Sequence, residues 1–219
     1  MRLGIRPAVF LIRLLGIFAL TYVLWAPFAP AYTQLLATLT EGFLHLTEAS
    51  SDPNLHRVTE MWVKGTAIFY RHRLFPDFQA PGIPAEWVEA NLVLLIPLML
   101  ATPARSLGQR FGRLILALVI ALVVQVLDVS VTVKCFYARE LGEYSQLYYG
   151  SSLRRWYQFG NAFTQAMDTQ LFPFAIWAGI HLRQLLGRSA PGAAAVPVRA
   201  PAAVPGRKNK PPKKRVKSH

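Results

Sequence analysis

The stretch that decides the fold is residues 114–133, LILALVIALVVQVLDVSVTV, in which Gln125 and Asp128 are the exceptions to an almost continuous run of Leu, Val, Ile and Ala. Twenty such residues are the length that a helix needs to cross the hydrocarbon core of a bilayer, which is about 30 Å thick. Three further apolar runs lie at about 9–31, 87–102 and 159–182. We therefore predict an all-α integral membrane protein with four transmembrane helices within residues 1–187.

The composition agrees with this fold class. Hydrophobic residues make up 53% of the 219 residues, which is high for a soluble domain. The formal net charge is +13, but ten of the 24 basic residues follow Leu182 in a segment rich in Pro, Ala and Gly. The charge therefore belongs mostly to a tail and does not indicate a core that binds nucleic acid. The single cysteine, Cys135, excludes an internal disulfide and a multi-cysteine metal site.

The distribution of charge predicts the orientation in the membrane. Sixteen basic residues precede the first apolar run or lie near its start (Arg13), lie between the second and third runs, or follow the fourth, in stretches without Asp or Glu. The other two connections contain the remaining eight Lys and Arg residues. All eleven Asp and Glu residues lie in these two connections or in the apolar runs next to them. Because Lys and Arg are enriched in cytoplasmic loops, both termini and the loop 103–113 are predicted to be cytoplasmic. The connections 32–86 and 134–158 are predicted to be external.

The external segment 32–86, about 55 residues, is long enough to fold. Its first part, Thr33 to Glu48, places leucines near helical spacing, which predicts an amphipathic helix on the membrane surface or capping the bundle. Residues 58–75 are rich in β-branched and aromatic types, which favours strand pairing. Within them, Arg71-His72-Arg73 is predicted to be a solvated or headgroup-facing cluster.

The first apolar run also fits a second interpretation. Arg2 and Arg6 could form the basic region of a signal peptide, and Ala29-Pro30-Ala31 has the small-x-small pattern of a cleavage site. The apolar run is long for a signal peptide, so we favour a retained span.

Residues 188–219 are predicted to be a disordered cytoplasmic tail, because they contain too little apolar surface to form a core. Lys and Arg near an anionic leaflet are attracted to it, whereas specific binding of single-stranded nucleic acid usually requires interleaved aromatic residues, which the tail lacks. The predicted anionic lipid-binding residues are Arg207, Lys208, Lys210, Lys213, Lys214, Arg215 and Lys217.

Ionisable residues within spans are the sharpest candidates for a functional site, since an unpaired charge there costs several kcal/mol. Asp128 and Asp168 both fall toward the predicted external side and could share one water-filled cavity. Such a cavity would bind a proton, a cation or a partner helix. The simpler interpretation, which we favour, is that both carboxylates only reach the outer interface. The accompanying candidates are Gln165 and Asn161, which we expect to bridge helices, and Arg154 and Arg155, as possible counter-ions.

Nucleophilic catalysis and metal binding are less well supported. Cys135 would need a nearby base or cation, but His181 lies at the opposite end of the predicted bundle. His45, His56 and His72 match no compact metal-ligand spacing. We therefore predict no catalytic residue, no metal and no cofactor.

A hairpin of the predicted spans resembles a known family. The stretch EANLVLLIPLMLATP, residues 89–103, followed by Arg105, Arg110, Arg113 and the apolar run to Gln125, is similar to the exosortase H-associated membrane proteins of bacteria. The resemblance covers about forty residues. It implies an inner-membrane protein linked to a system that recognises, cleaves and sorts proteins with a C-terminal membrane anchor, without itself being the transpeptidase.

The predicted function is that of a non-enzymatic accessory or assembly protein of the bacterial cell envelope. Its expected partner is a membrane protein, such as an exosortase or its substrate, held through the external segment and the polar face of the fourth span. The alternative is a small transporter or channel subunit in which Asp128 and Asp168 line a hydrated path. A membrane-embedded cysteine enzyme ranks third.

Overall fold

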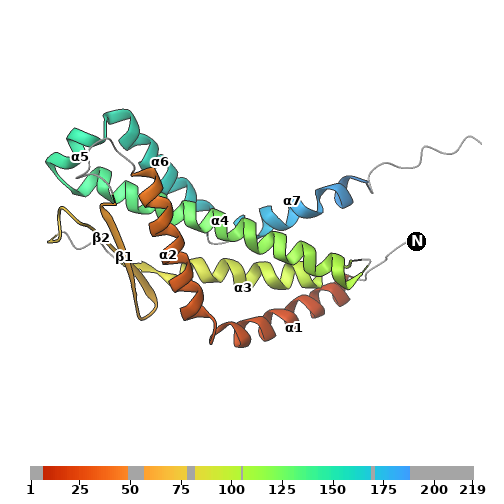
Figure 1. Cartoon of the computed structure of the whole chain (residues 1–219). Coiled ribbons are helices and arrows are strands. Elements are labelled where there is room, and N and C mark those ends of the chain that lie inside the picture. Colours follow the sequence, from red (N-terminus) through yellow and green to blue (C-terminus); the bar gives the residue numbers. More distant parts are fainter. Residues whose placement is uncertain (1–6, 49–56, 78–81, 105, 169–170, 188–219) are drawn as a thin grey trace, which may run out of the picture. The chain divides into compact units, whose positions relative to one another are not determined.

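The computed structural model describes residues 7–48, 57–77, 82–104, 106–168 and 171–187. These residues form seven helices and one three-stranded antiparallel sheet in the order β1-β2-β3 (Figure 1). The helices are α1 Pro7–Trp25, α2 Ala29–Thr47, α3 Ala85–Ala101, α4 Leu107–Glu140, α5 Glu143–Tyr148, α6 Ser151–Asp168 and α7 Leu171–Gly187. The strands are β1 Thr59–Lys64, β2 Ala67–His72 and β3 Ile83–Pro84. The predicted fold class is thus confirmed as mostly helical, but the sheet means that it is not all-α.

Among the described residues, two helices are long and apolar enough to cross a membrane, α1 over Ala8–Trp25 and α4, Leu107–Glu140. With 34 residues, α4 is about 50 Å long and exceeds the hydrocarbon core of a bilayer. One face of α4 is exposed, and the opposite face is buried against the rest of the fold. The buried face carries a residue every fourth position: Ala117, Ala121, Gln125, Val129 and Val133.

The helix and strand pairing predicted within 32–86 are both present. The helix α2 buries Leu36, Ala37 and Leu44 against α4 and β1, so it caps the bundle. The strands β1 and β2 form a hairpin that pairs Thr59 with His72 and Lys64 with Ala67. We refer to α2, the three strands and α5 together as the cap module. Its core is continuous with the buried face of the last turns of α4.

Two predicted loops are helical instead. The loop expected at 103–113 is shorter, because α4 begins at Leu107 after the side chain of Ser106 accepts a hydrogen bond from the Gln109 amide, at 3.2 Å. The loop expected at 134–158 is replaced by the end of α4, by α5 and by the start of α6. Both errors have one cause: Lys, Arg and Glu end an apolar run but are good helix formers, so the helix continues past the run.

The predicted fourth run, 159–182, is divided between two helices, since α6 ends at Asp168 and α7 begins at Leu171. Pro173 occupies the first turn of α7, where its missing amide proton costs no helical hydrogen bond. The described apolar part of α7, Leu171–Leu182, is shorter than a typical span. In the same way, the first run is interrupted after Trp25, and α2 starts with Pro30 in its first turn.

The link from α4 to α5 depends on a glycine. Gly142 has φ +57° and ψ −123°, a backbone conformation that is accessible almost only to glycine. We expect Gly142→Ala to lower the free energy of unfolding by roughly 1–2 kcal/mol. Gly112→Ala is the matched control: Gly112 is exposed within α4 with open space around it, so alanine there should be neutral or stabilising by up to about 1 kcal/mol. Detergent-titration unfolding of the two variants checks this, and equal effects would contradict it.

Candidate functional site

Asp128, the only acidic residue of the apolar run, lies at a pocket between the cap module and the helices. The pocket has a volume of about 300 Å³, which is at the small end of the range for ligand sites. Five elements or their connections contribute to it: β2, the strand β3 with the residue before it, α3, α4 and α6. The lining residues are Tyr70, Gly82, Ile83, Pro84, Trp87, Val88, Asp128, Thr132 and Gln165. Two of the predicted site residues, Asp128 and Gln165, are therefore brought together.

Polar contacts between α4 and α6 surround this pocket. The Thr132 hydroxyl donates a hydrogen bond to the Asn161 side-chain oxygen at 3.0 Å, so Asn161 bridges α6 to α4. One turn further along α6, the Thr164 hydroxyl lies within hydrogen-bonding reach of the Asp128 carboxylate and of the Asn161 carbonyl, at 3.1 Å. A hydroxyl has one proton, so Thr164 satisfies only one of these acceptors at a time. Asp128 consequently keeps acceptor capacity toward the pocket.

The predicted counter-ions of Asp128 lie elsewhere. Arg154 and Arg155 are in the first turn of α6, ten residues before Thr164, which corresponds to about 15 Å along the helix. Among the described residues neither arginine forms an ion pair with Asp128. Asp168 ends α6, and its side chain lies outside the described part, so a cavity shared by the two aspartates stays a prediction.

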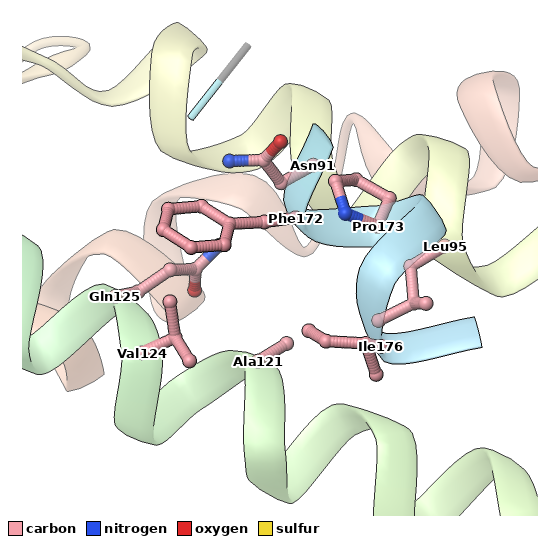
Figure 2. Close-up of a pocket in the computed structure, with 8 residues that line it drawn as sticks. All are labelled: Asn91, Leu95, Ala121, Val124, Gln125, Phe172, Pro173 and Ile176. Atoms are coloured by element: carbon pink, nitrogen blue, oxygen red, sulfur yellow. The ribbon is translucent and has the colours of Figure 1, made fainter. Parts of the chain in front are cut away.

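A closely packed layer lies next to Gln125, one helical turn before Asp128 (Figure 2). The cavity in this layer has a volume of only about 10 Å³, roughly the space of one water molecule. The Gln125 amide group donates a hydrogen bond to the Val88 carbonyl at 2.8 Å and accepts one from the Tyr32 hydroxyl. The surrounding residues come from α3, α4 and α7: Asn91, Leu95, Ala121, Val124, Phe172, Pro173 and Ile176.

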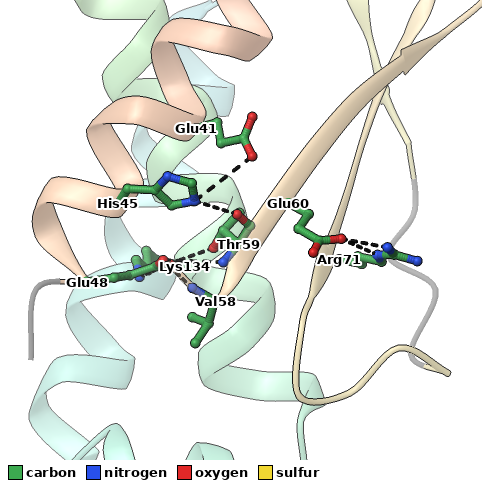
Figure 3. A network of polar contacts seen from close by, with 8 residues as sticks. All are labelled: Glu41, His45, Glu48, Val58, Thr59, Glu60, Arg71 and Lys134. Carbon is green, nitrogen blue, oxygen red and sulfur yellow. Dashed lines mark hydrogen bonds and ion pairs between the residues drawn. The ribbon is translucent and has the colours of Figure 1, made fainter. Parts of the chain in front are cut away.

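A buried ion pair joins the cap module to α4 (Figure 3). The Lys134 ammonium lies 2.8 Å from the Glu48 carboxylate, and their side chains are 13% and 4% exposed. The same carboxylate accepts hydrogen bonds from the Val58 amide at 3.1 Å, and from the Thr59 amide and hydroxyl at 3.3 and 2.5 Å. Glu48 thus connects the end of α2, the start of β1 and α4. Sequence reasoning missed this pair because its members are 86 residues apart.

His72 is buried beside this ion pair, and the predicted solvation of Arg71-His72-Arg73 is wrong for its middle residue. His72 is 1% exposed, and its ring packs against Phe75, Tyr137 and Tyr144 with centroids 4.7 to 5.3 Å apart. The period of two along β2, which also buries Ile68 and Tyr70, is the signal that would have found it. The neighbouring arginines are exposed.

The opposite face of the hairpin carries an exposed ladder of aromatic and charged side chains. Trp62 stacks on Phe69 with centroids 6.0 Å apart, and the Arg71 guanidinium lies 5.8 Å from the centroid of the Trp62 ring. Arg71 also pairs with Glu60 at 2.6 Å (Figure 3). We call these four residues the hairpin ladder. Trp and Arg are the residue types most enriched at energetically important positions of protein interfaces.

Cys135 and His181 are far apart, as predicted. Cys135 is buried near the end of α4 and lies close to Arg139. His181 lies near Arg113, close to the start of the same helix. The 22 positions of α4 between Arg113 and Cys135 correspond to roughly 33 Å, so these two residues cannot act on one substrate atom.

The histidines of residues 32–86 do not converge where the structure describes them. His45 lies 2.7 Å from the Thr59 carbonyl, whereas His72 is enclosed by aromatic rings. The described residues contain no cluster of three or more His, Cys, Asp or Glu that could hold a metal ion. His56 and the predicted lipid-binding residues of the tail lie outside the described residues.

Comparison of the chain with models of protein families, with curated proteins and with solved structures finds no match.

Proposed function

We propose that the protein is a non-enzymatic accessory or assembly protein of the bacterial inner membrane, which holds a membrane partner through its cap module and the Asp128 pocket. In this proposal the chain is multi-pass, both termini are cytoplasmic, and the cap module lies outside the membrane. The observation that carries the proposal is the buried Glu48–Lys134 pair at the end of α4. It fixes a folded module directly onto a helix that is long enough to cross the bilayer and continue beyond it.

A rigid connection of this kind suits a protein that presents a surface. The cap module and α4 share one hydrophobic core, so the hairpin ladder is held in a constant orientation relative to α4. Fixed anchor residues lose little conformational entropy when a partner binds. The sequence resemblance to exosortase-associated proteins supports a partner from a protein-sorting system, such as the peptidase or an anchored substrate.

The packing next to Gln125 favours this function over transport. A transporter would need a hydrated path that continues from Asp128 toward the opposite membrane face. In the described residues the adjoining cavity is about 10 Å³, and Gln125 is committed to contacts with Val88 and Tyr32. The polar side chains around Asp128 therefore line a pocket that strands of the cap module help to enclose.

A pulldown of the tagged native protein in mild detergent, followed by mass spectrometry, tests the proposal. We expect a membrane peptidase or a protein with a C-terminal anchor to be retained. Trp62→Ala, in the hairpin ladder, should reduce retention at least about tenfold, because an interface anchor contributes about 1.4 kcal/mol or more. Glu140→Gln, at an exposed acid of α4 outside the cap module and the pocket, is the control and should leave retention unchanged. Recovery of the protein alone as a defined homo-oligomer would contradict the proposal.

A further inference from the structure

The geometry of the Asp128 pocket points to a specific ligand: the guanidinium group of an arginine side chain that the partner presents to this pocket. This inference rests on the proposed function and names the chemistry by which its partner is recognised. It is carried by the charge of the lining, by the aromatic wall and by the position of the chain's own arginines.

The charge of the pocket lining favours a cationic ligand. Asp128 is partly buried, and a carboxylate removed from bulk water is stabilised by an adjacent cation. The nine described residues that line the pocket include one carboxylate and no Lys or Arg. The arginines of α6 are about 15 Å away along the helix. The structure therefore supplies an anionic group in a cavity and leaves the cation to be provided by another molecule.

The pocket lining also favours a planar cation. Trp87 lines the pocket and is 56% exposed, so its ring is available to a planar cation. A guanidinium stacks on an indole ring and forms two parallel hydrogen bonds to one carboxylate, whereas an ammonium is a more strongly hydrated point charge. The Gln165 amide oxygen offers a further acceptor in the same lining. These features fit arginine better than lysine.

An arginine side chain fits the pocket better than a lipid headgroup does. An ethanolamine headgroup also presents a cation, but a phosphate is attached a few bonds away. That phosphate would be stabilised by a positive charge, and none of the nine described lining residues carries one. The rest of the lining is largely apolar, which suits the methylene stem of an arginine side chain. A protein side chain therefore matches the pocket more completely.

The test uses the full-length protein in nanodiscs of phosphatidylcholine and measures saturation binding of radiolabelled N-acetyl-arginine amide. We expect saturable binding that unlabelled arginine amide displaces, and that the uncharged analogue N-acetyl-citrulline amide does not. Asp128→Asn should weaken binding at least about tenfold, because a charge-assisted pair is lost. Trp87→Leu keeps the carboxylate and should weaken binding roughly threefold to tenfold through loss of the stacking contact. Glu140→Gln, at an exposed acid of the same helix, is the matched control and should bind as the wild type does.

Several outcomes would overturn the inference. Equal binding by wild type and Asp128→Asn, or equal displacement by the citrulline analogue, would show that the carboxylate does not recognise a cation. If Trp87→Leu and Asp128→Asn each bind arginine amide as the wild type does, the ligand does not bind in this pocket. Loss of arginine binding when phosphatidylethanolamine is added to the nanodiscs would identify the lipid headgroup as the occupant and contradict a protein partner at this pocket.

The same variants separate this inference from the proposed function. If the pulldown retains a partner equally well with wild type and with Asp128→Asn, the accessory function stands and the arginine site is wrong. If arginine amide binds as expected and no partner is retained, the pocket chemistry stands and the accessory function is wrong. Retention that Asp128→Asn reduces and Glu140→Gln does not would support both.

Discussion

Replacing Glu48 with alanine is expected to lower the free energy of unfolding by about 3–5 kcal/mol, the largest effect of any single substitution considered for this chain. The Glu48 side chain is 4% exposed and its partner Lys134 is 13% exposed. Removing the carboxylate leaves a mostly buried ammonium without its counter-ion. It also removes the acceptor of the Val58 and Thr59 amides and of the Thr59 hydroxyl, and each unsatisfied buried donor adds its own cost.

The structure also predicts where the effect will appear. Because Glu48 joins α2, β1 and α4, hydrogen exchange should accelerate in the cap module, first at the Val58 and Thr59 amides. Detergent-titration unfolding supplies the free energy. Glu41→Ala is the matched control: Glu41 lies two turns earlier on the same helix, 3.9 Å from His45, and its side chain is 31% exposed. A surface pair of this kind contributes at most about 1 kcal/mol. Equal losses of unfolding free energy in Glu48→Ala and Glu41→Ala would therefore contradict a buried Glu48–Lys134 pair.

Acidification from pH 6.5 toward pH 4 is expected to destabilise the cap module by up to about 3 kcal/mol through His72 alone. Burial among aromatic rings lowers the pKa of His72 from 6.5 to about 4; the neighbouring Glu48 opposes this shift and Lys134 adds to it. In the unfolded chain His72 binds a proton near pH 6.5, whereas in the folded protein it binds one only near pH 4. The contribution of neutral His72 is therefore complete above pH 6.5 and is lost as the pH falls toward 4.

His72→Phe separates this contribution from other titrations. Phenylalanine keeps an aromatic ring among Phe75, Tyr137 and Tyr144, although it loses the hydrogen bond that the His72 ring nitrogen Nδ1 accepts from the Leu74 amide at 3.3 Å, worth about 1 kcal/mol. Wild type should be about 1 kcal/mol more stable than the variant at pH 7.5 and less stable than the variant at pH 4, because only wild type loses the contribution of neutral His72. Parallel curves for wild type and His72→Phe would show that His72 does not titrate differently on folding.

The sequence predicted most of the secondary structure, for reasons that act locally. The apolar run 114–133 lies entirely within α4, the leucine spacing of Thr33 to Glu48 lies within α2, and the β-branched and aromatic residues of 58–75 form the hairpin. Each pattern indicates which side chains are buried away from water, and the spacing of these side chains along the chain indicates a helix or a strand. Boundaries were less predictable, because charged residues such as Arg113 and Lys134 end an apolar pattern without ending a helix.

What the sequence determined by itself is an apolar helix long enough for a membrane, a folded segment between its first two apolar runs, and an isolated carboxylate at Asp128. The tertiary structure decided which partners these residues have. Glu48 reaches Lys134 across 86 positions, β2 turns His72 inward, and the residues around Gly82 and Trp87 complete a pocket beside Asp128. Such pairings depend on how helices and strands pack in three dimensions, and local periodicity carries no information about contacts between distant segments.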